Sequence, residues 1–233
     1  MPRTSGSTRR TVYDELRRRV VSLALPPGSP VSENEIAADL GVSRTPVREA
    51  MIMLVQDGLV QVFPKVGSFV TRVDLRRVAD SQFVREAVEL ASLADVPAEP
   101  DRVVVGELTV NLARQRVCTD NDEFFQLDEE FHRGLLRLAG HEGTWPAVVA
   151  AKAHLDRARR LGLEENRSPE VFAEQHAAVL DALLASGPGA AVPLLRSHLR
   201  AVFDDIERVR ERSPELFAPS AGRPTRRSVA VWE

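Results

Sequence analysis

Apolar side chains recur at helical spacing in three blocks of the first third of the chain. These blocks are Val12, Leu16, Val20 and Leu23, then Ile36, Ala37 and Leu40, then Val47, Met51, Leu54 and Val55. The spacing predicts helices over residues 11–24, over a short stretch after Ser32, and over residues 43–57. Gly41 ends the middle helix because glycine tolerates a left-handed turn. The last two helices should therefore be joined by a tight turn.

Residues with capping chemistry stand at the predicted helix starts. Ser32 and Glu35 have the spacing of a capping box, and Ser43 is placed to cap the second helix of the pair. Pro46 is tolerable in the first turn, where backbone donors lack partners. The segment LPPGSPVSE, residues 25–33, predicts a turn before the pair.

The pattern then changes from helical to extended. Residues 59–63 and 66–71 read as two strands, and Pro64, Lys65 and Gly67 shape the tip between them. This region therefore predicts three helices followed by a two-stranded β-hairpin.

After Val73 the pattern is helical throughout, with no further strand. Breaks rich in turn-forming residues separate six predicted helices, over residues 74–95, 99–118, 121–139, 144–163, 168–186 and 190–212. Their apolar stripes are wide enough to build one bundle. The fold class is thus mainly α, with an arm at 1–10, a first domain at 11–73, an all-helical domain at 74–212 and a flexible tail at 213–233.

Composition narrows the class of protein. The chain contains no run of about 18 apolar residues, so no transmembrane helix is predicted. The polar N-terminus is not expected to be a signal peptide. The single cysteine, Cys118, fits a reducing cytoplasm. Residues 1–73 carry ten Lys and Arg against seven Asp and Glu, whereas the remainder carries 21 against 27. A basic front on an acidic body is typical of a DNA-binding module joined to a different domain, and the modest excess favours a dimer on two half-sites.

The start of the predicted helix at 43–57 presents polar and basic side chains away from its apolar stripe. Arg44, Thr45 and Arg48 lie near its N-terminus, which suits insertion into the DNA major groove. The run GVSRTPVREA at 41–50, followed by DGLV and GSFV, resembles the winged helix-turn-helix of GntR-family bacterial transcription regulators. The resemblance implies that Ser43, Arg44, Thr45, Pro46 and Arg48 meet operator DNA, and that Lys65 and Gly67 place the wing tip at the adjacent groove.

All five histidines lie between His132 and His198, outside the first domain. His132, His176 and His198 fall on helix faces that otherwise look buried, and Asp128 precedes His132 by four residues, so these two share a helix face. One carboxylate and three imidazoles are a ligand set for a divalent transition metal. Spacing alone leaves open a second interpretation, three unrelated buried histidines that are each satisfied by a hydrogen bond.

The second domain resembles the all-helical effector domain of the FadR subfamily, the FCD domain, in its six-helix VanR-like form. The matching stretches are DEEFHRGLLRLAG, EQHAAVLDALL and RSHLRAVFDDI. The resemblance implies that Asp128, His132, His176 and His198 bind a metal such as Zn, Ni or Mn, and that a small carboxylate metabolite is the effector. It also matches Arg85 to an arginine that often lines the effector pocket. An ordinary salt bridge between Arg85 and Glu89 is the alternative for that residue.

The function expected from the sequence is a cytoplasmic, homodimeric, ligand-responsive regulator that binds operator DNA, in the repressor mode commoner among relatives. It is not expected to be an enzyme. Three alternatives remain at this stage. The metal itself could be the signal, or the metal could be structural with no sensing role. The third is a metal-dependent hydrolase, for which the sequence supplies no general acid or base beside the metal.

Overall fold

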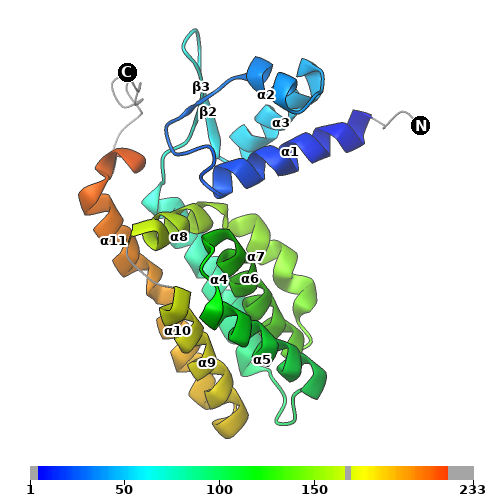
Figure 1. Cartoon of the computed structure of the whole chain (residues 1–233), viewed down its shortest axis with the longest axis vertical. Helices are drawn as coiled ribbons and strands as arrows, with labels where there is room; N and C mark the ends of the chain where they lie inside the picture. The colour runs from blue at the N-terminus through cyan, green and yellow to red at the C-terminus, as the bar shows by residue number, and fades with distance from the viewer. Residues whose placement is uncertain (1–4, 166–168, 220–233) are drawn as a thin grey trace. The chain divides into compact units, whose positions relative to one another are not determined.

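The computed structural model describes residues 5–165 and 169–219 and divides into two compact units (Figure 1). The first unit comprises the described residues up to Leu75 together with those from Ser213 onward, and the second unit comprises Arg76–Arg212. Within the described residues, no helix is both long enough and apolar enough to cross a membrane. The mainly α fold class predicted from the sequence is confirmed.

Three helices build most of the first unit, and they are α1 (Ser5–Val21), α2 (Glu33–Asp39) and α3 (Arg44–Gln56). α1 packs along α3, and the apolar stripes that predicted the helices are buried at this contact, including Leu16, Val47 and Leu54. α1 begins at Ser5, so the expected disordered arm at 1–10 is wrong for residues 5–10. Residues 1–4 lie outside the described part.

The two predicted caps have different outcomes. The Ser32 side chain accepts a hydrogen bond from the backbone N–H of Glu35, as a capping serine should. Ser43 occupies the N-cap position of α3 with extended backbone angles, but its side chain makes no capping hydrogen bond. The prediction that Ser43 caps α3 through its hydroxyl is therefore wrong, and that hydroxyl faces solvent.

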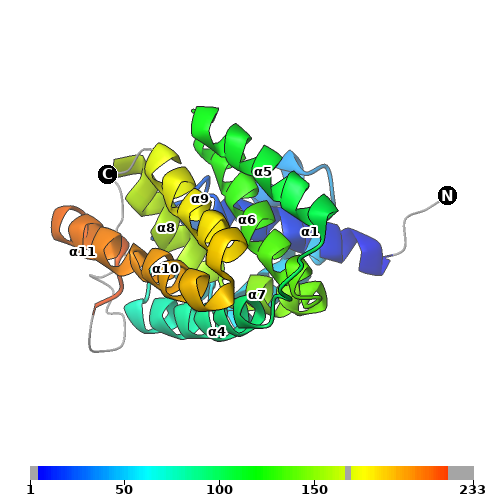
Figure 2. The same cartoon turned by 90° about the horizontal axis from the view of Figure 1, so that it is seen from below.

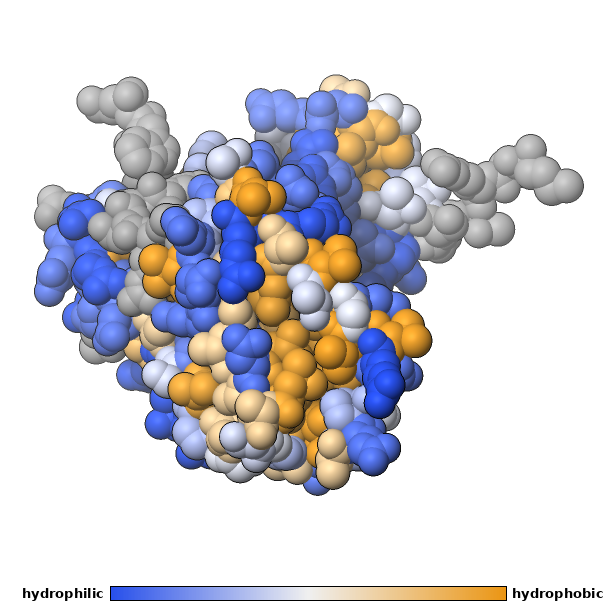
Figure 3. Space-filling view, turned by 60° about the horizontal axis from the view of Figure 1, so that its bottom comes forward, coloured by the Kyte–Doolittle hydropathy of each residue, from blue (hydrophilic) through white to orange (hydrophobic). Residues whose placement is uncertain are grey.

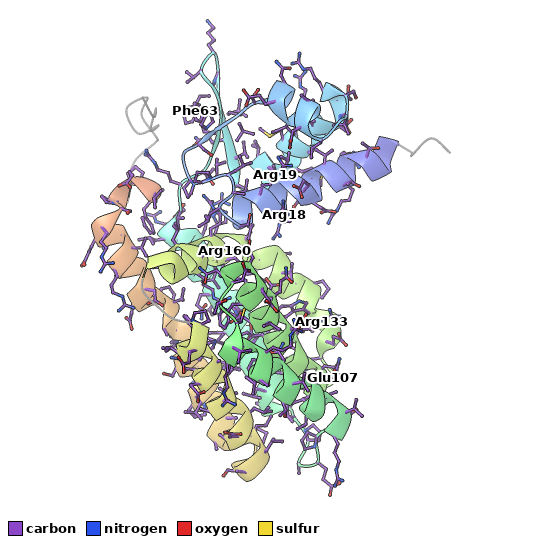
Figure 4. The ribbon with its side chains drawn as sticks, viewed as in Figure 1. Arg18, Arg19, Phe63, Glu107, Arg133 and Arg160 are labelled. Carbon is purple, nitrogen blue, oxygen red and sulfur yellow. The ribbon has the colours of Figure 1, made fainter. Side chains whose placement is uncertain are left out.

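A small antiparallel sheet completes the first unit. Strands β2 (Val60–Phe63) and β3 (Gly67–Val70) form the predicted hairpin, in which Phe63 meets Phe69 edge to face. Figure 4 labels Phe63. A third strand, β1 (Pro30–Val31), pairs with β3, so the order is β1-β3-β2. The sequence analysis predicted only two strands, because two residues beside three prolines and a glycine read as a turn.

The second unit is a layered bundle of helices (Figure 2). Its helices are α4 (Leu75–Ala94), α5 (Arg102–Val117), α6 (Asn121–Leu138), α7 (Trp145–Ala151), α8 (Ala153–Glu165), α9 (Pro169–Ser186), α10 (Pro188–Arg200) and α11 (Val202–Arg212). Two of the six predicted helices are therefore each divided in two, at Lys152 and at Ala201. At Ala201 the backbone N–H is shared between the carbonyls of Ser197 and His198, which tightens the chain locally.

The chain then returns to the first unit. Pro214–Leu216 form a 3-10 turn, and Phe217 pairs with Val73 in a parallel bridge. Val73 donates its N–H to the carbonyl of Leu216, and Ala218 donates to the carbonyl of Val73. Because Val73 and Phe217 are both buried, the predicted flexible tail at 213–233 is wrong for its first residues. Residues 220–233 lie outside the described part.

Candidate functional site

The exposed start of α3 is the first candidate site. Ser43, Arg44, Thr45 and Arg48 are solvent-exposed, whereas Pro46 is half-buried against the unit. One turn further, Val47, Ala50 and Met51 are buried and fix the helix on α1 and α2. A rigid helix that offers two guanidinium groups and a hydroxyl at its free end has the donors that read base edges and phosphates.

The tip of the hairpin is the second exposed basic feature. The N–H of Val66 donates to the carbonyl of Phe63, which closes a turn around Pro64 and Lys65. Lys65 adopts a φ of +64°, a left-handed conformation that is strained for a residue with a side chain. Gly67, with a φ of +143°, follows without such strain. The turn thus leaves Lys65 exposed at the tip of the hairpin.

Four potential metal ligands converge inside the second unit. Asp128 and His132 come from α6, His176 from α9 and His198 from the last turn of α10. None is more than 6% exposed, and one ligand atom from each lies within 4.8 Å of the others. The structure therefore brings together all four residues that the sequence analysis selected.

The separations between ligand atoms suit a shared cation. Nε2 of His176 lies 3.1 Å from Nε2 of His198 and 3.6 Å from Oδ1 of Asp128. Nε2 of His132 lies 3.3 Å from Nε2 of His198 and 3.8 Å from Oδ1 of Asp128. With zinc–nitrogen bonds of about 2.0–2.1 Å, neighbouring ligand atoms around one ion are separated by roughly 3 Å.

The other nitrogen of each imidazole meets an oxygen. Nδ1 of His176 lies 2.7 Å from Oε1 of Gln115, and Nδ1 of His198 lies 2.8 Å from Oε1 of Gln175. The Gln115 amide nitrogen donates to Asn111 and to the Leu127 carbonyl, which leaves its oxygen for His176. If Nδ1 carries the proton and donates it to these oxygens, Nε2 has a free lone pair. This is the tautomer that can bind a metal through Nε2.

The charge balance of the cluster also favours a cation. Oδ2 of Asp128 is buried and forms no hydrogen bond within the described residues, while Oδ1 accepts from Arg159 at 2.7 Å. Burial acts to raise the pKa of Asp128, but the positive charge of Arg159 outweighs it and holds that pKa well below its ordinary value. Burial lowers the pKa of His176 and of His198 far below 6.5, so both rings stay neutral. A carboxylate and neutral imidazole lone pairs therefore face one point, and this donor set fits a divalent transition metal.

Arg85 has a buried partner of its own. Its Nε donates to Oε1 of Glu89 at 2.6 Å, and the Oε2 atom of Glu89 lies 2.7 Å from Nδ1 of His132. Although burial opposes ionisation, Arg85 and His132 lower the pKa of Glu89 to about 2. The salt-bridge alternative for Arg85 is thus present in the structure, and it connects Arg85 to a predicted metal ligand.

A small cavity of about 20 Å³ lies beside the cluster. It is lined by Arg85, Phe124, Arg159, Phe172, His198, Leu199, Val202 and Asp205. This volume holds about one water molecule. Two guanidinium groups and a ligand histidine therefore face one space, which suits an anion but requires side chains to move before an organic acid can enter.

Sequence reasoning missed the partners of the four ligands. Gln115, Gln175, Glu89 and Arg159 lie 61, 23, 43 and 31 residues from the groups they contact, respectively. No local spacing could have paired them. The only usable signal is that Gln115 and Glu89 are polar residues at positions where the helical period predicts burial.

Comparisons with known proteins agree with this architecture. Residues 8–70 match the family of bacterial regulatory proteins of the gntR family, and residues 80–201 match the FCD domain. A Streptomyces ambofaciens protein, described as an HTH-type transcriptional regulator in an unstable DNA locus, is 60% identical over the full length of both chains. The HTH-type transcriptional repressor RspR of Escherichia coli is 31% identical over 89% of this chain and 92% of its own.

A solved structure shows the same fold. That of E. coli McbR/YncC superimposes with a TM-score of 0.72 at 20% identity, covering 86% of this chain and 97% of that one. The family and the names of the relatives indicate a regulator and not an enzyme, so the hydrolase alternative is set aside. This chain therefore belongs to the GntR family of bacterial regulatory proteins, and it is a DNA-binding transcription regulator with an FCD domain.

Proposed function

We propose that this regulator is a homodimeric repressor whose second unit binds a divalent transition metal and, over that metal, a small carboxylate. The observation that carries the proposal is the convergence of three imidazole Nε2 atoms and one carboxylate oxygen within 4.8 Å, fully buried. Without a cation, such lone pairs would repel one another. A metal held there would act as a Lewis acid toward an anionic ligand.

Operator recognition is assigned to the first unit. In the major groove, the base edges or the flanking phosphates would be contacted by Arg44, Thr45 and Arg48, with Ser43 and Pro46 beside them. The adjacent groove would be reached by Lys65 and Gly67. Their exposure on a rigid helix and on a constrained turn supports this assignment. A bidentate arginine contact to a base is worth about 1–3 kcal/mol of binding free energy.

The cavity beside the cluster is the proposed effector site. Arg159 projects from α8 toward Asp128, and Arg85 lines the same space, so a carboxylate could bridge a guanidinium and the metal. The sequence analysis named Arg85 alone. Arg85 is paired with Glu89 and Arg159 with Asp128, so a carboxylate would have to share one of these guanidinium groups. Arg159 is the stronger candidate for the direct contact because its partner is one of the four proposed metal ligands.

The path from effector to DNA is proposed to run through α11. Its first turn, with Val202 and Asp205, lines the cavity, and its C-terminal end continues into the segment in which Phe217 pairs with Val73. An effector that requires the cavity to widen would displace α11 and so change its linkage to the first unit. Effector and operator would then bind different states of the protein, so the binding of either one would lower the affinity of the protein for the other.

Repression is proposed because relatives carry that name, RspR among them and also a gluconate operon repressor of Bacillus subtilis. A dimer is proposed because paired recognition helices match operators made of two half-sites.

The test combines metal content, thermal stability and DNA binding of the purified full chain. The metal-loaded protein should melt at a higher temperature than the chelated protein, because binding to the folded state adds about 2.7 kcal/mol at a hundredfold excess over Kd. Asp128→Asn and His176→Gln should lose this shift. His141→Gln, which changes a histidine outside the cluster, should keep it.

The same preparations distinguish an organic effector from metal sensing alone. Acetate, malate and citrate would be added to the loaded protein while its binding to the upstream region of its own gene is followed by fluorescence anisotropy. Release of DNA by one of these acids, lost in Arg159→Ala, supports the proposal. DNA binding that responds to chelation but to no acid would favour the metal as the signal. No metal uptake by the wild type would refute the metal site.

A further inference from the structure

A second cavity lies in the second unit, between α5, α6 and the turn at Glu142. We call it the α5–α6 cavity. Its volume is about 290 Å³, whereas the cavity beside the metal cluster holds about one water molecule. Pockets that bind small molecules begin at about 300 Å³, so this one is large enough for a small ligand. Figure 4 labels two of its lining residues, Glu107 on α5 and Arg133 on α6.

The two helices that build the cavity are in close contact. Gly134 of α6 lines the cavity, and a Cβ added to it would lie 2.5 Å from Cδ2 of Leu108 on α5, closer than packed carbon atoms approach. Val104 and Leu108 belong to the core of the second unit and also line the cavity. In the view of Figure 3, hydrophobic surface lies next to hydrophilic surface over the helices of the second unit. The cavity is therefore built on packed helices and is partly apolar.

The charges around the cavity leave one carboxylate uncompensated. Glu107 is paired with Arg137 across the two helices. Glu142 is paired with Nη2 of Arg133 at 2.6 Å. The third acidic residue, Glu130, forms no ion pair with any described residue. Three carboxylates against two guanidinium groups give the lining a net charge of −1. An anion would have to displace a glutamate from its arginine, so a monovalent cation is the better complement.

A chain of hydrogen bonds connects Glu130 to the predicted metal ligand His176. Nδ2 of Asn111 donates to Oε2 of Glu130 at 3.2 Å, and Oδ1 of Asn111 accepts from Nε2 of Gln115 at 2.7 Å. Oε1 of Gln115 in turn lies 2.7 Å from Nδ1 of His176. Both amides also donate to the Leu127 carbonyl. Because Asn111 and Gln115 are buried, each amide takes its orientation from its neighbours in the chain and not from water.

We propose that the α5–α6 cavity binds a small primary ammonium ion at Glu130, and that this binding is transmitted to the metal ligands through Asn111 and Gln115. A primary ammonium group carries one positive charge and three N–H donors, which match a carboxylate that has no cationic partner. The apolar surface of Val104 and Leu108 suits a short aliphatic chain attached to the nitrogen. The ligand class is therefore a small aliphatic amine.

Binding of the amine should weaken metal binding. An ammonium group that takes Oε2 of Glu130 removes one acceptor from Asn111, so the Asn111 amide can turn and no longer fixes Gln115. The Gln115 oxygen then holds the ring of His176 less firmly. Complete loss of such an outer partner lowers metal affinity by about 10–100-fold, so loosening it should cost about 5–10-fold. By reciprocity, the metal should lower amine affinity by the same factor. This link rests on the proposed metal site, whereas the amine site itself does not.

Direct binding is tested on the purified, metal-free full chain with n-butylamine at pH 7, where an alkylamine is protonated. Isothermal titration should show one site per chain. Glu130→Gln should bind at least about ten times more weakly, because its amide lacks the charge. Glu99→Gln, which removes an exposed carboxylate outside the cavity, should bind as the wild type does. Tetramethylammonium carries the charge without N–H donors and should not bind. Equal binding of the two cations would overturn the ammonium site.

The link is tested by measuring zinc affinity against a competing chelator, with and without saturating n-butylamine. The amine should lower the zinc affinity of the wild type by about 5–10-fold and should not change that of Glu130→Gln. Gln115→Met, which keeps the shape but breaks the hydrogen-bond chain, should still bind the amine, and this binding also shows that the variant is folded. The amine should not change its zinc affinity. An equal amine effect in Gln115→Met and the wild type would overturn transmission through Gln115.

The outcomes separate this inference from the proposed function. Normal zinc uptake without binding of n-butylamine would overturn the inference and leave the metal site intact. Amine binding that is lost in Glu130→Gln, together with no zinc uptake by the wild type, would support the amine site and refute the metal site and the link to it. Amine binding that leaves the zinc affinity of the wild type unchanged would overturn the link.

Discussion

Oε2 of Glu89 lies 2.7 Å from Nδ1 of His132, and both side chains are completely buried. Glu89 therefore stands between Arg85 and a predicted metal ligand and fixes the ring so that Nε2 faces the cluster. Such outer partners raise the basicity of a ligating imidazole and restrict its orientation.

Glu89→Gln should weaken metal binding by about 10–100-fold, because the amide keeps the shape but not the charge. Isothermal titration against a competing chelator measures the change. Glu86→Gln is the matched control, since Glu86 lies on the same helix but pairs with Arg200. Equal metal affinity in Glu89→Gln and wild type would show that Glu89 does not orient His132.

The metal-free protein should lose stability as the pH falls below about 6.5. Burial depresses the pKa values of His176 and His198 in the folded state, whereas the unfolded chain protonates both rings near 6.5. Below that pH the unfolded state binds more protons, so the free energy of unfolding decreases, by at most about 2.7 kcal/mol per pH unit for two groups. Chemical denaturation from pH 7.5 to 5 would measure this slope.

The pH range of the stability loss and the behaviour of two variants identify the titrating groups. Glu89, with its folded pKa lowered to about 2 from a usual value of 4.5, contributes stability that is lost only below pH 4.5, outside this window. His198→Asn should roughly halve the slope, and His141→Gln should leave it unchanged. A flat profile in the wild type would contradict the neutral, buried state of the two rings.

Lys65→Asn should weaken DNA binding while preserving or raising stability. Asparagine tolerates the left-handed backbone at a φ of +64°, so the free energy of unfolding should rise by up to about 1 kcal/mol. Loss of one phosphate contact should reduce the slope of log affinity against log salt by about 1. Lys65→Arg should retain the slope. An unchanged salt dependence in Lys65→Asn would remove Lys65 from the DNA interface.

Phe217→Ala should destabilise the first unit by about 3–5 kcal/mol, because Phe217 is only 5% exposed and the chain beside it is hydrogen-bonded to Val73. Hydrogen exchange of the Val73 amide would report the opening of this bridge. Phe203→Ala on α11 is the control, since Phe203 is 38% exposed. If the proposed path is correct, Phe217→Ala should also reduce the effect of an effector on operator affinity.

The sequence was sufficient for the features that depend on neighbours along the chain. Helical spacing in the first unit, the Ser32 cap and the tip between β2 and β3 were predicted because each involves residues within about one helical turn or one hairpin. Asp128 and His132 were assigned to one helix face for the same reason. His176 and His198 were selected because their helix faces look buried, and the resemblance then favoured a shared metal site over unrelated histidines. Spacing alone could not show that α9 and α10 meet α6.

Tertiary contacts decided the remainder. Val31 pairs with Ser68, and Phe217 with Val73, across separations that no local pattern reports. The Ser43 hydroxyl makes no capping hydrogen bond, and the helices expected at 144–163 and 190–212 are each divided in two. The tautomers of the ligand histidines depend on Gln115, Gln175 and Glu89, which come from other helices or other turns. The sequence by itself thus determined which side chains are available for the chemistry. Only the fold decided which of them meet, because burial brings together groups that are far apart in the chain and removes the water that would otherwise satisfy them.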